Sequence, residues 1–181
     1  MEIHLMIVRE ARLDDASAIA RVHVDTWRTT YRKIVPDDYL ASLSYEKRES
    51  GWVQILSTAV EGNHFTYIVE NEVRQIVGFA SAGPERTKDS VYQSELYAIY
   101  ILKAYQQQGI GRCLTQTLVK RLYESGFHSM LVWVLADNPA CRFYEALGGQ
   151  KVYEKQDETG GSILNEIAYG WTDTLSLITG I

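Results

Sequence analysis

The sequence predicts a single α/β domain with a mixed, mostly antiparallel central sheet and flanking helices. Three observations support this fold class. Helical patterns come first, a group of β-type segments follows, and the second half alternates strand, helix, strand and helix before a closing hairpin. Hydrophobic residues make up 46% of the 181 residues, enough for one sizeable core. We expect one domain over residues 1–181, with a core at about 6–171 and an apolar tail at 172–181.

A strand at residues 6–10 begins this core, and three helical stretches follow it. Asp14 and Asp15 offer an N-cap for the first helix. This helix carries large side chains at steps of four, which lie on one helix face: Ile19, His23, Trp27 and Tyr31. Pro36 ends the first helix and starts a short second one, and a third helix is expected at about 45–59.

An antiparallel group of strands is expected next. Residues 64–70 and 73–82 are predicted to form a hairpin with its turn at Asn71-Glu72. A polar loop at 85–90 then leads to a long strand at 95–102, which is rich in aromatic and branched residues.

The remaining elements alternate. A helix from Gly109 to about Gly126 precedes the apolar run 130–135, which is typical of a strand covered on both faces. The strand at 95–102, this helix and the strand at 130–135 form a crossover unit, which should be right-handed. Asn138-Pro139 starts another helix, and the final strands are expected at the following ranges: 151–156 and 163–171, around the turn Gly160-Gly161.

The loop Gln106–Arg112, between a strand and a helix, is the most informative segment. Two glycines leave backbone N–H groups uncovered at a helix N-terminus, an arrangement that binds phosphate groups. A Walker loop would require Lys-Ser/Thr after the last glycine, but Arg112-Cys113 follows Gly111. The dinucleotide fingerprint would require a third glycine where Leu114 stands.

The pattern Gln-x-x-Gly-x-Gly that does fit resembles the GNAT superfamily of acyl-CoA-dependent N-acyltransferases. Gln106, Gly109 and Gly111 match its fixed positions. A second match begins at Asn138 and includes Phe143-Tyr144 and Gly148, although the phenylalanine usual after that glycine is replaced here by Gly149. The order of elements resembles the family over about residues 6–171.

The resemblance implies a parallel strand pair that splays apart around an acetyl-CoA thioester, which makes the protein an acetyl-CoA-dependent N-acetyltransferase. The pyrophosphate would then lie on loop amides, and the pantetheine arm along the strand before the loop. The residues that this assigns to the cofactor are Ile99, Tyr100, Ile101, Gln106, Gln107, Gln108, Gly109, Ile110, Gly111, Arg112 and Asn138.

Direct transfer to an amine in a ternary complex needs proton donation and acceptance but no covalent intermediate. Tyr144 matches the family's Phe-Tyr pair and is the candidate acid that protonates the leaving thiolate; the alternative is a core tyrosine. Glu95 lies where some family members carry a catalytic glutamate and is the candidate base, directly or through water. The alternatives for the base are a chain of water molecules and, for Glu95 itself, a role as an ordinary strand-end carboxylate.

The acceptor is expected to be a primary amine on a small polyamine-like or amino-acid-like molecule, or a protein or peptide amine. In the family, helices after the first strand build its pocket, which here offers Trp27, Tyr31 and Tyr39 as aromatic surface. Asp37 and Asp38 could attract a cationic amine. A GNAT-like acyl-CoA sensor or scaffold module and a nucleotide-binding regulatory domain remain the alternative functions.

Composition excludes several other classes. The net charge of -5 argues against a protein that coats nucleic acid, and no apolar run approaches the roughly 20 residues of a membrane span. Cys113 and Cys141 form no metal-ligand or disulfide pattern, so we expect no metal and a reducing, cytoplasmic setting. The apolar run Leu175–Ile178 predicts contact with a partner subunit, hence a possible homodimer; the alternative is packing on the protein's own sheet.

Overall fold

The computed structural model describes residues 6–179, and the ends of the expected domain and tail at 1–5 and 180–181 lie outside these residues. The N-terminal half holds the following elements: β1 (Ile7–Glu10), a 3-10 turn (Leu13–Asp15), α1 (Ala16–Thr30), α2 (Asp37–Ser42), α3 (Tyr45–Ser57), β2 (Phe65–Glu70) and β3 (Ile76–Pro84). The second half holds β4 (Ser94–Ile101), a 3-10 turn (Lys103–Tyr105), α4 (Ile110–Glu124), β5 (Met130–Leu135), α5 (Ala140–Ala146), β6 (Gln150–Thr159), β7 (Ser162–Trp171) and α6 (Leu175–Thr179).

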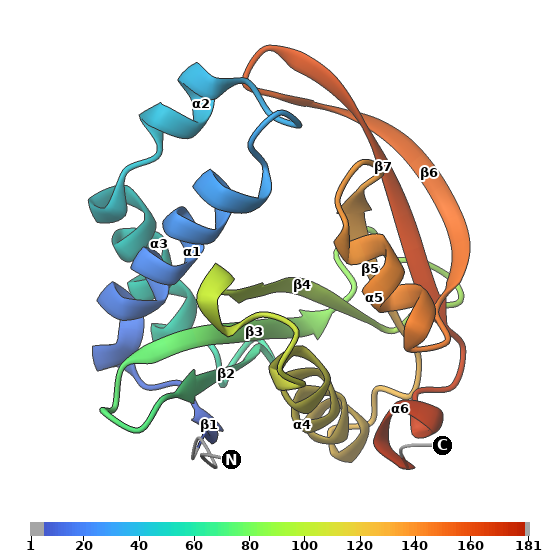
Figure 1. Cartoon of the computed structure of the whole chain (residues 1–181). Coiled ribbons are helices and arrows are strands. Elements are labelled where there is room, and N and C mark those ends of the chain that lie inside the picture. Colours follow the sequence, from blue (N-terminus) through green and yellow to red (C-terminus); the bar gives the residue numbers. More distant parts are fainter. Residues whose placement is uncertain (1–5, 180–181) are drawn as a thin grey trace.

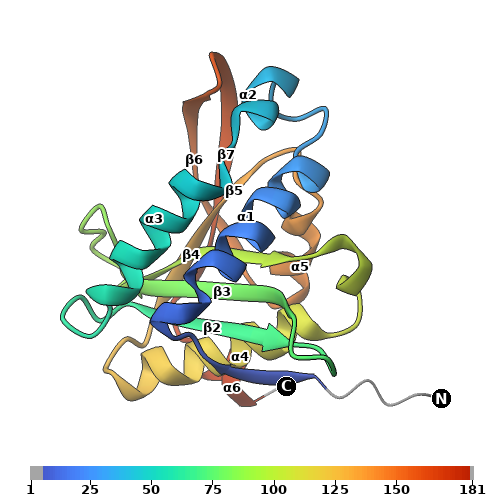
Figure 2. The same cartoon turned by 90° about the vertical axis from the view of Figure 1, so that its left-hand side faces the viewer.

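The strands form one seven-stranded sheet in the order β1-β2-β3-β4-β5-β7-β6, which confirms the predicted mixed, mostly antiparallel architecture. Among the strands of residues 6–179, only β4 and β5 pair in parallel, and the crossover helix α4 connects them. In Figures 1 and 2, α1 and α3 cover one face of β2–β4, and α4 covers the other. The sheet therefore separates two apolar layers.

The larger layer lies under α4. Leu114, Leu118 and Leu122 recur every four residues on the buried face of this helix and pack against Val77 and Met130. This is the spacing that predicted the helix, and burial of its apolar stripe is what stabilises it. The second layer, under α1 and α3, is centred on Ile19, Trp52 and Phe79. The two layers hold β4 firmly from both sides.

Local structure departs from the sequence predictions at two points. Asp15 precedes α1 but makes no cap bond to it; its carboxylate instead accepts from Arg9 and from the Arg12 N–H. The expected hairpin strand at 73–82 begins only at Ile76, because Asn71 Oδ1 accepts from the N–H groups of residues 73 and 75 and holds that segment as a turn.

The C-terminal tail also differs from expectation. Residues 175–179 form α6, which packs against α4, and Leu177 is only 4% exposed within the main core. The prediction that this tail contacts a partner subunit is therefore wrong for Leu177, because its side chain is buried in the core of its own chain. Leu175 stays partly exposed. A homodimer remains a prediction, which Leu177 does not support.

His23 gives the fold a pH-dependent stability. Burial lowers its pKa from 6.5 to about 3, and its Nδ1 accepts a hydrogen bond from Trp52 Nε1 (3.2 Å), which a protonated ring could not do. The unfolded chain binds a proton at His23 more readily than the folded chain does. The contribution of neutral His23 to the free energy of unfolding is therefore fully present above about pH 6.5 and is lost as the pH falls toward 3. At pH 5 we expect a loss of about 2 kcal/mol. Urea unfolding at pH 7.5 and 5 measures it.

The control variants for this prediction are His23→Phe and His64→Gln. His64 is partly buried, and this desolvation lowers its pKa, so it contributes with the same sign. His23→Phe should remove most of the change in the free energy of unfolding between pH 5 and 7.5. His64→Gln should remove the smaller remainder. A wild-type slope that survives in His23→Phe would contradict the assignment to His23.

Candidate active site

The centre of the sheet is split. β4 and β5 pair through only three residues each, from Ser94↔Met130 to Leu96↔Val132. Tyr97 is an extra residue in β4, because Ala82 pairs with Leu96 whereas the preceding β3 residue, Ser81, pairs with Ala98. Such a bulge bends a strand, and β4 leaves β5 at this point. A cleft of about 800 Å³ occupies the opening.

A run of free backbone donors lies at one end of the cleft. Gln106 N–H donates to Lys103 and Cys113 N–H donates to Gly109, but the N–H groups of residues 107–112 have no acceptor within the described chain. Gly109 (φ 82°) and Gln107 (φ 60°) have left-handed backbones that turn these groups toward the start of α4. Donors at a helix N-terminus fit an anion such as a pyrophosphate, and Arg112 adds a positive charge.

Two glutamine side chains fix the shape of this loop. Gln106 Nε2 donates to the carbonyl of Ile101 (2.9 Å), and Gln108 Nε2 donates to that of Ala104 (3.0 Å). Gln108 does not line the cleft, and the Ile110 side chain is buried in the core. Among the predicted cofactor residues, these two can therefore contribute only their N–H groups.

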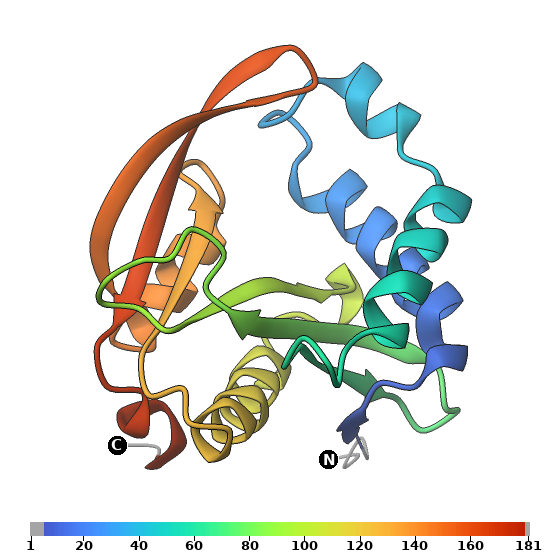
Figure 3. The same ribbon diagram turned by 180° about the vertical axis from the view of Figure 1, so that it is seen from behind.

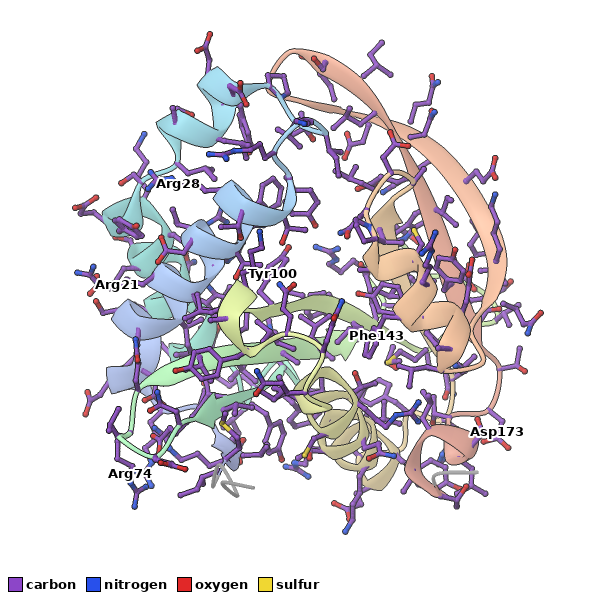
Figure 4. All side chains as sticks on the ribbon, viewed as in Figure 1. Arg21, Arg28, Arg74, Tyr100, Phe143 and Asp173 are labelled. Atoms are coloured by element: carbon purple, nitrogen blue, oxygen red, sulfur yellow. The ribbon has the colours of Figure 1, made fainter. Side chains whose placement is uncertain are left out.

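Gly111 allows the loop and α5 to approach closely. A Cβ placed there would lie 3.3 Å from two ring atoms of Phe143 and 3.5 Å from Ile101 Cδ1. Figure 4 shows Tyr100, from the end of β4, and Phe143, from α5, on the two sides of the split. The predicted strand residues Ile99, Tyr100 and Ile101 all line the cleft.

Tyr144, the candidate acid, also lines the cleft and is 5% exposed. Burial raises its pKa, with a smaller contribution from the neighbouring Tyr100, so the phenol stays protonated over the whole neutral range. Its hydroxyl makes no hydrogen bond to any residue between 6 and 179. A protonated hydroxyl without a protein acceptor is available to a bound molecule.

Glu95, the candidate base, does not line the cleft. It is 2% exposed, and both of its carboxylate oxygens accept from Arg86, at 3.0 Å from Nε and 2.5 Å from Nη2. The carboxylate raises the pKa of the Arg86 guanidinium, first through this hydrogen bond. Any contact between Glu95 and an amine in the cleft therefore has to pass through water.

Asn138 and Tyr31 meet across the cleft. Asn138 Oδ1 accepts from Ala140 N–H at the start of α5, and its Nδ2 donates to the Tyr31 hydroxyl (3.2 Å). Of the three predicted pocket aromatics, only Tyr31 lines the cleft. Trp27 lies behind it, with ring centroids 4.5 Å apart, and Tyr39 lies behind Trp27 at 6.3 Å.

The structure adds cleft residues that the sequence reasoning missed: Thr26, Thr29, Thr30, Tyr97, Lys103, Trp133 and Arg142. Arg142 immediately precedes the Phe-Tyr pair, and Lys103 follows β4 directly, so both residues could have been predicted from their position next to the motifs. The threonines carried no such signal. Asp37 lines a separate surface depression with Arg28 and Lys33, so the attraction of a cationic amine by Asp37 and Asp38 stays a prediction that the lining of the cleft does not support.

Within residues 6–179, no three metal-ligating side chains gather into a site for an ion. No helix in the same range combines the length and the hydropathy that a membrane crossing requires.

Comparison with known sequences gives consistent matches. Residues 85–157 match the model of the FR47-like protein family. The chain is 43% identical to the uncharacterized N-acetyltransferase YuaI of Bacillus subtilis (strain 168), over 97% of this chain and 98% of YuaI. It is 24% identical to the L-amino acid N-acyltransferase MnaT of Escherichia coli (strain K12), over 79% and 78% of the two chains.

Solved structures share the fold. ACIAD1637 of Acinetobacter baylyi ADP1 superposes with a TM-score of 0.77 at 26% identity, over 96% of this chain and 95% of that one. The structure of yncA from Salmonella typhimurium, which holds its cofactor acetyl-CoA, superposes with a TM-score of 0.70 at 21% identity, over 92% of each chain. The 43% identity to YuaI extends over nearly the whole length of both chains, and the solved structures share the fold. The chain therefore belongs to the GNAT family of acetyl-CoA-dependent N-acetyltransferases.

Proposed function

We propose that this protein transfers an acetyl group from acetyl-CoA directly to the primary amine of a small, amino-acid-like acceptor, in a ternary complex. The observation that carries the proposal is the continuity of one cleft. The free amides of the loop, the bent half of β4, Tyr144 and the wall formed by α1 all border the same space of about 800 Å³. Donor and acceptor can therefore meet without a covalent relay.

The donor would bind in two parts. Amides of residues 107–112 and the Arg112 guanidinium would hold the pyrophosphate. The pantetheine arm would follow β4 past Ile99 and Ile101, where the strand has left β5 and its edge is free. Asn138, whose side-chain groups are already bonded, would act by holding Tyr31 and the start of α5 in place.

The chemical step has balanced proton transfers. The deprotonated amine nitrogen attacks the thioester carbonyl carbon, the C–N bond forms, and the C–S bond breaks as CoA leaves. Tyr144 would give its proton to the departing sulfur. The proton from the amine would pass through water to Glu95, since the carboxylate is separated from the cleft.

A Glu95→Gln variant tests the base. Removing the acceptor of the amine proton should lower kcat/KM by at least about tenfold at neutral pH and change the acidic limb of the pH–rate profile. Glu70→Gln is the matched control, because Glu70 is another buried carboxylate paired with arginine but lies far from the cleft, between β1 and β3. An unaltered profile in Glu95→Gln would leave water alone as the proton acceptor.

The acceptor class follows from the charge of the cleft. No carboxylate from residues 6–179 lines it, whereas Lys103 and Arg142 do, in addition to the Arg112 that would hold the pyrophosphate. A polyamine would find no counter-charge, so we propose an acceptor with a single amine and an anionic or neutral remainder. The L-amino acid substrates named for MnaT belong to this class.

The test is an amine screen with acetyl-CoA, read as free thiol released. The panel compares L-amino acids, spermidine and the corresponding amino-acid amides. We expect turnover to be fastest with L-amino acids and slowest with spermidine. Binding of acetyl-CoA, seen as thermal stabilisation, without turnover on any amine would instead favour an acyl-CoA sensor or scaffold.

A further inference from the structure

The turn between β2 and β3 is held by the side chain of one buried asparagine. Asn71 is 9% exposed, and its Oδ1 accepts from the N–H groups of Val73 (3.2 Å) and Gln75 (2.9 Å). Its backbone N–H also donates to the Gln75 carbonyl (3.0 Å). These bonds fix the amide group within the turn and leave its Nδ2 available to a residue outside it.

That residue is Tyr105. Asn71 Nδ2 donates to the Tyr105 hydroxyl (3.1 Å), and Tyr105 ends the 3-10 turn that directly precedes the loop at 106–112. The contact forms because β3 and β4 are antiparallel, so Gly78 near the start of β3 pairs with Ile101 at the end of β4. Figure 3 shows these strands side by side, and Figure 2 shows the β2–β3 turn and the segment after β4 on the same side of the molecule.

The bond between Asn71 and Tyr105 anchors the loop to a distant part of the chain. The other side chains of residues 102–112 that form hydrogen bonds within residues 6–179, Gln106 and Gln108, donate to carbonyls at most five residues away. The ring of Tyr105 packs against the main core, and Asn71 fixes its hydroxyl end. The start of the loop is therefore held in place before any anion reaches the free amides at 107–112.

We propose that Asn71 is a positioning residue for the donor, which holds the loop in its pyrophosphate-binding conformation through Tyr105. The inference rests on the proposed function and extends the donor site to a turn outside the cleft, since neither residue lines the cleft. A loop that is ordered in advance loses less conformational entropy when its ligand binds, and this raises the affinity. The effect should concern the pyrophosphate end of acetyl-CoA and leave the acetyl transfer itself unchanged.

The experiment compares acetyl-CoA with acetyl-pantetheine, a donor that has the same thioester and arm but no pyrophosphate. Tyr105→Phe and Asn71→Ser each remove the bond, and the dissociation constant of acetyl-CoA in titration calorimetry should rise about fivefold. kcat/KM for acetyl-CoA, measured by thiol release with an L-amino acid, should fall by a similar factor. The value for acetyl-pantetheine should stay within about twofold of the wild type, because this donor never contacts the loop amides.

The double variant Asn71→Ser/Tyr105→Phe tests whether the two residues act through one bond. The effects on acetyl-CoA affinity should then not add, and the double variant should bind acetyl-CoA as tightly as the weaker-binding single variant. Tyr45→Phe is the matched control, because the Tyr45 hydroxyl also bonds a side chain, that of Asp25 (2.5 Å), but lies on α3 and does not line the cleft. It should leave the values for both donors unchanged.

Each outcome separates this inference from the proposed function. An unchanged acetyl-CoA affinity in both single variants, equal losses with both donors, or additive effects in the double variant would overturn the positioning role of Asn71 alone. A wild type that binds acetyl-CoA but acetylates no amine would overturn the proposed function, and calorimetry on the variants would still decide the role of Asn71. A wild type that does not bind acetyl-CoA would overturn both.

Discussion

Replacing Tyr144 with phenylalanine is expected to lower kcat by about 10³-fold while acetyl-CoA affinity stays within about twofold. The variant keeps the aromatic ring, which packs beside Phe143 and Tyr169, and loses only the hydroxyl. Without that group, CoA must leave as an unprotonated thiolate. Because the pKa of Tyr144 is raised by burial, the wild type should show no loss of activity from tyrosine ionisation below about pH 10.

Tyr169→Phe is the control for this prediction. Tyr169 neighbours Tyr144, but its hydroxyl donates to Glu145 (2.8 Å) and it does not line the cleft. Its removal should cost about 1 kcal/mol of stability with little change in kcat. Steady-state kinetics and calorimetric titration with acetyl-CoA separate the two effects. An unchanged kcat in Tyr144→Phe would remove the acid role and return Tyr144 to a purely structural one.

Replacing Gly111 with valine should raise the dissociation constant for acetyl-CoA about 100-fold, equivalent to about 2.7 kcal/mol. The new side chain would start 3.3 Å from the Phe143 ring and project into the cleft beside the free amides. Acetyl-CoA would then have less space in the cleft, and its phosphates could not approach the backbone N–H groups of the loop as closely. Titration calorimetry measures the affinity, and thermal unfolding in the absence of ligand measures the stability.

Gly51→Val is the matched control, because Gly51 is an exposed glycine inside α3 with nothing within 4 Å of an added Cβ. It should leave acetyl-CoA affinity unchanged. If Gly111→Val bound acetyl-CoA as tightly as the wild type, the loop at 107–112 would not be the cofactor site, and the assignment of the donor end of the cleft would fail.

The candidate donor side of the cleft could be predicted from the sequence because its residues are contiguous in the chain. The bent half of β4, the loop with Gly109 and Gly111, and the start of α4 follow one another in the chain. Their chemistry depends on backbone N–H groups and on glycines, whose effects are local. Spacing within one short segment was therefore enough to predict an anion site there, and the structure keeps its amides free.

The acceptor side was not predictable to the same degree, because it is assembled from distant segments. Whether Tyr31 or Trp27 borders the cleft depends on how α1 is rotated about its axis over β4. The spacing of four residues places both side chains on one helix face but does not determine this rotation. The pairing of Glu95 with Arg86 depends on the path of a polar loop. The burial of Leu177 depends on where the tail meets α4, and an apolar pattern fits a partner surface equally well.

Only three residue pairs join the two halves of the sheet through β4 and β5. A donor bound along the free part of β4 and against α5 would bridge that seam from within, so it would act as a part of the fold. A ligand at 100 times its dissociation constant adds about 2.7 kcal/mol to the folded state. The free energy of unfolding of this fold would then depend on the concentration of acetyl-CoA around it.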